Sequence, residues 1–295
     1  MSNAIELSNI SFAYNNTKPI LADLNFTLEQ GKVYSILGPN GAGKTTLINI
    51  MLGRLRPTSG RVSVLGHQPE SDFCRQRVGA MMQLGGLPLQ TKVKEFLALF
   101  ASYHQAPIPL ERLISLCQLA PFLEQTFDTL SGGQKQRLFM AIALAGNPDI
   151  VFLDEPSVGM DVESRQQLWQ AVRTLKQQNK TVLLTTHYLH EAEALADELL
   201  VLKEGKCTKL NDIPELANTY RRSQIKFTSD LSAAALVNAL PMIDLNVKGD
   251  QFTILTDEPN HILQQLLEKF SIRNLYVAPM SLEEAYLSLM NARSA

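Results

Sequence analysis

The sequence predicts a protein of the α/β class with a second, smaller α+β domain. Short apolar runs at residues 33–37, 150–154 and 181–186 alternate with helical patterns, which indicates a largely parallel sheet. The region from about 90 to 146 is almost entirely helical in pattern. After about residue 212 the pattern changes. We therefore expect one domain at residues 1–211, with a helical subdomain at about 85–147, and another at residues 212–295.

The elements of the first domain follow from the periodicity of the apolar residues. Alternation predicts strands at 5–14, 21–32 and 33–37 and a hairpin at 58–66. Spacings of three and four predict the helices, at 44–55, 92–105, 109–125, 132–146, 164–179 and 188–198. Apolar strands end at 154 and 186, and the stretch 199–207 closes the domain.

The second domain reads in the order β, α, β, β, α, β, which is the ferredoxin-like arrangement. The segments are 223–229, 231–240, 242–250, 251–257, 260–270 and 272–279. A last helix is expected at 281–292, where Leu282, Ala285, Tyr286 and Leu289 lie on one stripe.

Composition and charge exclude several classes of protein. The net charge of -2 and the pI of about 6.2 give no basic field, so no nucleic acid partner is expected. Cys74, Cys117 and Cys207 show no paired spacing, which predicts neither disulfides nor zinc. We expect a cytoplasmic protein, since the N-terminus lacks a signal peptide. The most apolar window, 139–146, is shorter than the ~20 residues of a membrane-spanning helix, so any membrane role requires a partner chain.

The stretch GPNGAGKT at residues 38–45 matches the complete pattern G-x-x-x-x-G-K-[ST] between a strand and a helix. Its glycines let backbone amides surround phosphate oxygens, Lys44 places a cation at the β- and γ-phosphates, and the Thr45 hydroxyl can bind Mg²⁺. The alternative is a simple glycine turn. We expect the loop to hold ATP through Gly38, Pro39, Asn40, Gly41, Ala42, Gly43, Lys44, Thr45 and Thr46.

An acidic pair follows the apolar strand IVFL. Neighbouring side chains on an extended chain point to opposite sides, so Asp154 and Glu155 can do different work. We expect Asp154 to hold Mg²⁺ and Glu155 to orient and deprotonate the attacking water. The alternative is a solvated acidic pair at a strand end.

The stretch TLSGGQKQR at residues 129–137 begins a helix. Ser131 and Gln134 form a capping box, but Gly132 and Gly133 weaken the first turn. One interpretation is that the glycines leave amides bare for an anion. The other is an ordinary capped helix.

These motifs together resemble the ATP-binding subunits of ABC transporters, because LSGGQ lies just upstream of VFLDEP in the order of that family. The resemblance covers roughly residues 1–210. It implies a P-loop NTPase of the ABC-ATPase type with a mixed sheet core, an antiparallel β subdomain and an inserted helical subdomain. It also implies that the signature segment closes over ATP held by the other subunit, through Leu130, Ser131, Gly132, Gly133 and Gln134.

Four further positions match this family. The resemblance implies that Tyr14 stacks on adenine, although a buried core tyrosine is the alternative. Gln83 corresponds to the glutamine that senses Mg²⁺ and the lytic water. Asp161 matches the loop that crosses the dimer, with Met160 in place of the commoner Leu. His187 corresponds to the histidine that contacts the γ-phosphate, the alternative being a capping histidine.

The resemblance implies an ATPase that uses ATP and Mg²⁺, dimerises around two nucleotides and drives a separate membrane permease. The ending SLEEAYLSLM and the segment 81–104 resemble ABC-2-type exporters of drugs, antibiotics and polysaccharides. Residues 85–100 and the region of Gln83 would receive the permease. We expect the chain on the inner face of the cell membrane, as a homodimer or paired with a paralogue.

Two other functions stay open. The first is a soluble ABC ATPase that acts on ribosomes, DNA or clusters. Such proteins commonly carry two cassettes or long coiled-coil inserts, and this sequence has neither. The second makes the C-terminal domain a regulatory ligand-binding module, although dimer contact or packing against the ATPase domain is the preferred interpretation.

Overall fold

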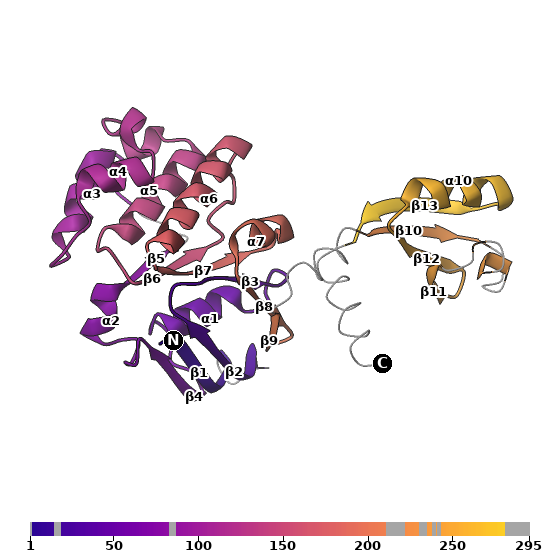
Figure 1. Cartoon of the computed structure of the whole chain (residues 1–295), viewed down its shortest axis with the longest axis horizontal. Coiled ribbons are helices and arrows are strands. Elements are labelled where there is room, and N and C mark those ends of the chain that lie inside the picture. Colours follow the sequence, from indigo (N-terminus) through magenta and orange to yellow (C-terminus); the bar gives the residue numbers. More distant parts are fainter. Residues whose placement is uncertain are drawn as a thin grey trace. The chain divides into compact units, whose positions relative to one another are not determined.

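The chain forms two compact units, residues 1–211 and 212–295, in a computed structural model (Figure 1). The structure describes residues 2–14, 19–82, 87–210, 222–229, 235–237, 240 and 243–280.

A six-stranded sheet forms the centre of the first unit, in the order β5-β6-β7-β3-β8-β9. Neighbouring strands are parallel except for the last pair, which makes the sheet mixed. Burial on both faces explains why the central strands are almost wholly apolar in sequence. The strands are β3 (Val33–Leu37), β5 (Val78–Met81), β6 (Ile150–Asp154), β7 (Thr181–Thr186), β8 (Glu198–Lys203) and β9 (Lys206–Leu210).

A second, antiparallel sheet of three strands has the order β2-β1-β4. Its strands are β1 (Asn3–Phe12), β2 (Leu21–Glu29) and β4 (Ser59–Val64). The predicted hairpin at 58–66 is wrong, because β4 pairs with β1, about fifty residues earlier in the chain. Beyond β4 only an isolated bridge joins Val64 to His67.

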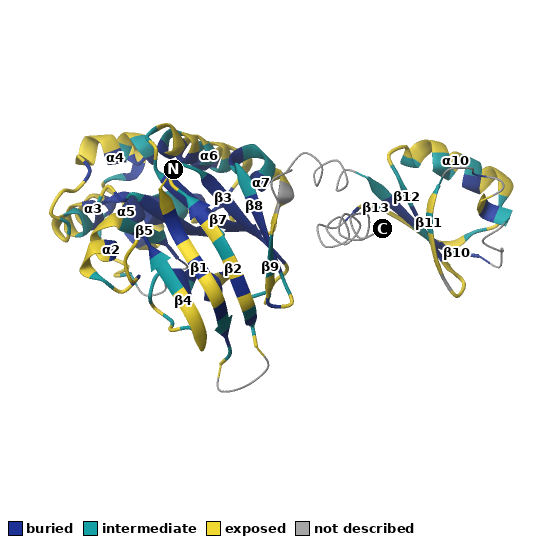
Figure 2. Cartoon of the chain, turned by 60° about the horizontal axis from the view of Figure 1, so that its bottom comes forward, coloured by how far each residue is buried: buried dark blue, intermediate teal, exposed yellow. Residues whose placement is uncertain are grey.

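Two hydrophobic clusters cover the opposite faces of the central sheet. Alternate residues such as Val151 and Leu153 pack with the helices between β5 and β6 and with α6. Ile150 and Phe152, on the other face, pack with α1 and the antiparallel sheet. Figure 2 shows the central strands buried between these layers. The helices are α1 (Lys44–Met51), α2 (Asp72–Arg77), α3 (Val93–Ser102), α4 (Leu110–Leu116), α5 (Gly132–Leu144), α6 (Val162–Gln177) and α7 (Leu189–Leu195).

The helical block between β5 and β6 is confirmed, with one difference. The continuous helix expected at 109–125 ends at Leu116, and a short 3-10 turn follows at Ala120–Phe122. Pro121 lies in the first turn of that segment. The break comes earlier, at Gln118, whose φ of 50° lies in the left-handed region, so the right-handed helix cannot continue through it. Pro121 is tolerated in the next turn because an amide at the start of a helix has no helical partner.

The second unit contains a four-stranded antiparallel sheet in the order β11-β12-β10-β13. This order agrees with the split arrangement predicted from the sequence. Most of the first helix of that pattern lies outside the described residues, as does the last helix, so the complete ferredoxin-like arrangement stays a prediction. The elements are β10 (Ser223–Thr228), β11 (Asp244–Lys248), β12 (Gln251–Thr256), α10 (Pro259–Lys269) and β13 (Arg273–Pro279).

Among the described residues, no helix combines the length and apolar character needed to cross a bilayer.

Candidate functional site

The loop between β3 and α1 depends on glycine for two different reasons. Gly41 and Gly43 have φ values of 80° and 102°, in the left-handed region that L side chains rarely adopt. Gly38 is required by space, because a Cβ there would lie 2.3 Å from the carbonyl oxygen of Leu202 on β8. The start of the loop therefore packs closely against β8, and the left-handed backbone at Gly41 and Gly43 makes the turn that leads into α1.

Lys44 begins α1 and is only 5% exposed. Its Nζ donates to the carbonyl oxygens of Gly38 at 2.8 Å and Pro39 at 3.2 Å. It also lies 3.8 Å from Oε1 of Glu155. These contacts place the ammonium group inside the loop, where the predicted phosphates would lie.

Asp154, at the end of β6, is buried and makes two hydrogen bonds. The Thr45 hydroxyl donates to its Oδ2 at 3.0 Å, and the Thr185 hydroxyl donates to its Oδ1 at 2.6 Å. A hydroxyl and a carboxylate oxygen thus converge at the start of α1. Oxygen atoms of this kind are the ligands that Mg²⁺ prefers.

Glu155 corrects one step of the sequence interpretation. The strand ends at Asp154, and Glu155 has φ 49°, so the two carboxylates are not neighbours on an extended chain. A non-glycine residue in this region is strained, and such strain concentrates at functional sites. The amide of Glu155 donates to Oγ1 of Thr185 at 2.9 Å, which holds the turn. The two carboxyl groups still have different surroundings, as expected.

His187 follows β7 and its Nδ1 lies 3.7 Å from Oε1 of Glu155. Helix α7 has Tyr188 at its N-cap and no side chain capping it, so the capping-histidine alternative is not supported. Lys44, Glu155 and His187, which are far apart in sequence, therefore meet at the carboxyl ends of β3, β6 and β7. Ligands bind open α/β sheets at this edge.

The predicted capping box at Ser131 is present. The Ser131 hydroxyl accepts from the amide of Gln134 at 3.3 Å, and the Gln134 side chain accepts from the amide of Ser131 at 2.8 Å. A Cβ on Gly133 would lie 2.9 Å from Oγ of Ser164, so close packing of α5 against α6 requires this glycine. Gly132 is exposed, and its nearest contact would be ordinary, 3.4 Å from the oxygen of Gly159. The neighbouring Leu130 is buried in the helical block.

Asp161 caps α6, because its Oδ1 accepts from the amide of Ser164 at 2.7 Å. This hydrogen bond holds the pKa of the Asp161 carboxyl below its ordinary value. The residue thus has a local structural role that the sequence interpretation missed. Its predicted role at a dimer interface is a separate matter.

The last two predicted residues are Tyr14 and Gln83. Tyr14 is 46% exposed, with its ring 4.8 Å from that of Phe12, so the core-tyrosine alternative is wrong. Gln83 lies outside the described residues.

Thr185 is the residue that sequence reasoning missed. It is fully buried and bonds both acidic residues of the site. A threonine at the end of the apolar run TVLL was the available signal, because a buried hydroxyl needs a partner.

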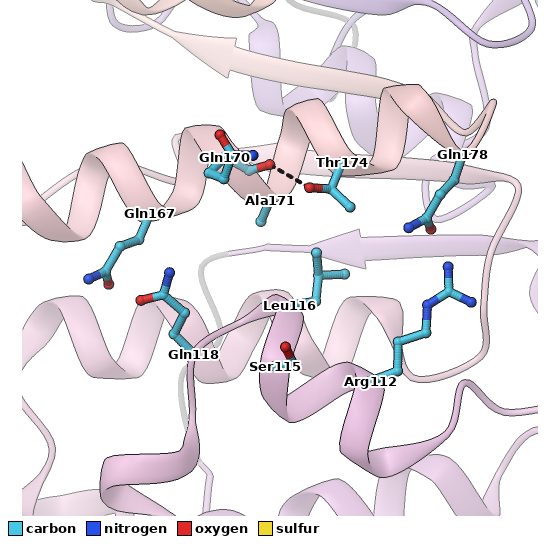
Figure 3. A pocket seen from close by; sticks show the side chains of 9 residues that line it. All are labelled: Arg112, Ser115, Leu116, Gln118, Gln167, Gln170, Ala171, Thr174 and Gln178. Atoms are coloured by element: carbon cyan, nitrogen blue, oxygen red, sulfur yellow. Dashed lines mark hydrogen bonds between the residues drawn. The ribbon is translucent and has the colours of Figure 1, made fainter.

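A separate cavity of about 320 Å³ lies between α4 and α6 (Figure 3). It is lined mainly by amide and hydroxyl side chains, together with Arg112. None of the predicted nucleotide-site residues lines it. The lining residues are Arg112, Ser115, Leu116, Gln118, Gln167, Gln170, Ala171, Thr174 and Gln178.

A glycine-rich loop, a buried lysine and a paired aspartate at the edge of a parallel sheet define a P-loop nucleotide-binding protein of the NTPase class. The family model described as ABC transporter matches residues 21–158. The chain is 31% identical over 295 residues to the Nod factor export ATP-binding protein I of Rhizobium johnstonii, covering 97% of this chain and 94% of that protein. It is 32% identical over 294 residues to the protein of that name from Burkholderia thailandensis, covering 97% and 96%. The chain belongs to the ABC transporter family, as one of its ATP-binding and ATP-hydrolysing subunits.

Solved structures show the same fold. An ATP-binding cassette, dimeric and bound to ADP and Pi in a post-hydrolysis state, is 26% identical with a TM-score of 0.63. The match covers 70% of this chain and 97% of that one. The ATP-binding subunit of an ABC transporter is 25% identical with a TM-score of 0.65, covering 73% and 92%. ATPase cassettes of this family dimerise and pair with membrane permeases. The predicted fold class of the first unit is confirmed.

Proposed function

We propose that this chain is the ATPase subunit of an exporter, and that two copies close around two Mg-ATP molecules to drive a separate permease. The arrangement of Lys44, Asp154, Glu155 and His187 supports this proposal, because it brings together, from loops far apart in sequence, groups that a phosphate and a metal ion would need. The relatives named for Nod factor export favour export over import.

ATP would lie along the loop at residues 38–46. Lys44, held by two carbonyl oxygens, would contact the β- and γ-phosphates, and the amides around Gly41 and Gly43 would surround their oxygens. Tyr14 would stack on the adenine, which its exposure permits.

The Thr45 hydroxyl and the Asp154 carboxylate fit a divalent cation, since their oxygens lie 3.0 Å apart and both are hard ligands. Gln83 would complete this set. When bound, Mg²⁺ neutralises charge on the phosphate oxygens. Thr185 would hold Asp154 in the orientation that the ion needs.

Glu155 would orient and deprotonate the attacking water, and His187 would steady it and contact the γ-phosphate. The strained backbone at Glu155, fixed by Thr185, supports this role because its geometry is set before ATP arrives.

The segment 130–134 would close over the ATP held by the other copy. Ser131 and Gly132 are exposed, and the side chains of Ser131 and Gln134 each accept a hydrogen bond from the other residue's backbone amide, which leaves this surface available to a partner. Asp161 would lie at the crossing between the copies. The pair is either two copies of this chain or this chain with a paralogue.

The permease would be a multi-span protein that carries drugs, antibiotics or other hydrophobic or polymeric substrates. It would hold this chain at the inner face of the cell membrane through the helical subdomain at about 85–147. Residues 1–211 would form the ATPase domain and residues 212–295 an accessory domain.

The test is nucleotide-dependent dimerisation of Glu155→Gln. We expect this variant to bind Mg-ATP without hydrolysing it and to elute as a dimer in size exclusion. The same variant with Mg-ADP should elute as a monomer. A Glu155→Gln protein that hydrolysed ATP at the parent rate would exclude Glu155 as the base.

The exporter role needs a second measurement. A neighbouring gene that encodes a multi-span membrane protein is the first candidate for the permease, and its product should be co-expressed with this chain and purified in detergent. A stable complex whose ATPase rate rises with transport substrate is the expected result, and a chain that remains in the soluble fraction and purifies without that protein would contradict it.

A further inference from the structure

Glu191, on α7, is a buried carboxyl group that the proposed mechanism does not use. Its side chain is 0% exposed. Oε2 accepts from the Ser157 hydroxyl at 3.0 Å, and Oε1 accepts from the indole Nε1 of Trp169 at 3.1 Å. Within the described part of the chain no cation pairs with Glu191, so these two neutral donors are its partners.

These two bonds join three segments around the site. Ser157 follows Glu155 by two residues, and Trp169 lies on α6. Helix α7 begins directly after the loop that carries His187. One carboxyl group therefore connects the loop of the proposed base, the loop of the proposed γ-phosphate contact and the helix that Asp161 caps.

The same segment continues to the signature motif. The turn that follows Glu155 is closed by the bonds from the amide of Val158 to the oxygen of Glu155 and from the amide of Met160 to the oxygen of Ser157. The oxygen of Gly159 faces Gly132, and Ser164 packs against Gly133. A continuous path of contacts thus runs from Glu191 through residues 157–164 to the start of α5.

We propose that Glu191 is a positioning residue that fixes the segment 155–161, and that through this segment the signature end of a protomer is coupled to its own Glu155. The inference rests on the proposed function, in which that signature end contacts the partner's ATP. Nucleotide bound at one site would then adjust the base of the other site. Trp169 donates a hydrogen bond to the same carboxyl group, so its fluorescence responds to changes around Glu191.

The substitution that tests this link is Ser157→Ala, which removes one donor and leaves the rest of the chain intact. We expect kcat to fall by about tenfold while KM for ATP changes little, because the base is misplaced but the phosphate loop is untouched. Ser229→Ala is the matched control. Ser229 is also buried and donates to a carbonyl oxygen, that of Ser271, in the second unit. Its loss should leave both constants unchanged.

Glu191→Gln tests the chemistry of the link. Gln can accept from Trp169 through its oxygen and donate to Ser157 through its amide, so we expect kcat to stay within about twofold of the parent. Glu191→Ala should lose activity as Ser157→Ala does. Equal losses in Glu191→Gln and Glu191→Ala would overturn the positioning role.

Fluorescence separates this inference from the proposed function, because Trp169 is the single tryptophan of the chain. In Glu155→Gln we expect Mg-ATP to shift the tryptophan emission. In Glu155→Gln with Ser157→Ala the dimer should still form in size exclusion, but the shift should be lost. An unchanged shift in the double variant, or an unchanged kcat in Ser157→Ala, would overturn the inference. Failure of Glu155→Gln to dimerise would instead contradict the proposed function. The kcat of Ser157→Ala would still show whether Glu191 positions the segment that carries Glu155.

Discussion

The loop at residues 38–45 and the segment at residues 130–134 both bring backbone amides to the start of a helix, but their surroundings differ. In the loop, Lys44 is buried, and both Asp154 and Glu155 lie within reach. In the segment, the side chains of Ser131 and Gln134 each bond to the other residue's backbone, and Gly132 is exposed. The loop at 38–45 is thus an organised region, with its charged side chains held in place inside one protomer. The segment at 130–134 is instead an exposed surface.

The difference explains how one chain can carry two kinds of glycine-rich motif. A preorganised phosphate site needs its charges fixed before ligand binds, which requires burial and supporting hydrogen bonds. A surface that closes over a ligand held elsewhere needs low bulk and exposed amides.

The largest expected effect comes from disabling each region in a different copy. Lys44→Ala and Gly132→Asp should each lower turnover on the order of a hundredfold, since one removes a phosphate contact and the other places a carboxylate against phosphate. An equal mixture should regain about a quarter of the parent rate. Random pairing makes about half of the dimers mixed, and each mixed dimer has one intact composite site.

The matched control for this mixture combines Lys44→Ala with Glu155→Gln. Both changes lie on the same side of the composite site, so no intact site can form and no activity should return. The measurement is the steady-state ATPase rate of the mixtures. Mixed dimers of the first pair that form but stay inactive would contradict sites shared between copies.

The next effect concerns Thr185, which supports both acidic residues of the organised region. Thr185→Val should lower kcat on the order of tenfold or more, because Asp154 and Glu155 lose their common partner. It should also lower the free energy of unfolding by about 1–3 kcal/mol. Urea denaturation and ATPase assays measure the two effects.

Thr181→Val is the control for that experiment. Thr181 lies at the opposite end of β7, is also buried, and accepts from the amide of Gly31 at 3.0 Å. Its loss should destabilise the fold to a similar extent and leave kcat unchanged. A fall in kcat in both variants would show that activity follows stability alone.

A smaller effect distinguishes the two glycines of the signature segment. Gly133→Ala should lower the free energy of unfolding by about 1–3 kcal/mol, because a methyl group there meets Ser164. Gly132→Ala should leave it unchanged or raise it by up to about 1 kcal/mol, since alanine favours the helix. If Gly132→Ala nevertheless weakens ATP-dependent dimerisation, the exposed glycine serves the partner rather than the fold.

The sequence predicts the conformation of the loop at residues 38–45 better than that of the segment at residues 130–134. The pattern of residues 38–45 requires a strand before it and a helix after it, so its conformation follows from local signals. The contact of Gly133 with Ser164 depends on the packing of two helices, which no local pattern reports. The same limit explains the wrong hairpin at 58–66, whose true partner strand is at the start of the chain.

The site residues show a similar division. Asp154 and Glu155 are found from a strand that ends in acids, but the left-handed backbone at Glu155 depends on its bond to Thr185 on the next strand. Thr185 was missed because it is one of three threonines in the run TVLLTT, and a threonine in a strand has several structural explanations. Trp169 and Glu191 are 22 residues apart in sequence and meet only in the folded chain.

The smallest expected effect comes from a cluster of charged side chains on β8, on β9 and just before β3. Lys32 and Lys209 both pair with Glu198. Burial alone raises the pKa of the Glu198 carboxyl, but hydrogen bonds from Lys209 and Lys32 outweigh it and hold the pKa below the ordinary 4.5. A lowered folded-state pKa stabilises the fold above pH 4.5, and this stabilisation is lost as the pH falls through the folded-state pKa.

Glu198→Gln should therefore cost about 1 kcal/mol or less at pH 7, and the difference from the parent should shrink as the pH falls below 4.5. Urea denaturation followed by Trp169 emission reports the first unit alone, since the single tryptophan lies there. ATPase activity at pH 7 should stay at the parent level, because Glu198 contacts neither glycine-rich region. A difference that grew on acidification would mean that the carboxyl is not stabilised in its charged form, and would remove the electrostatic explanation of this cluster.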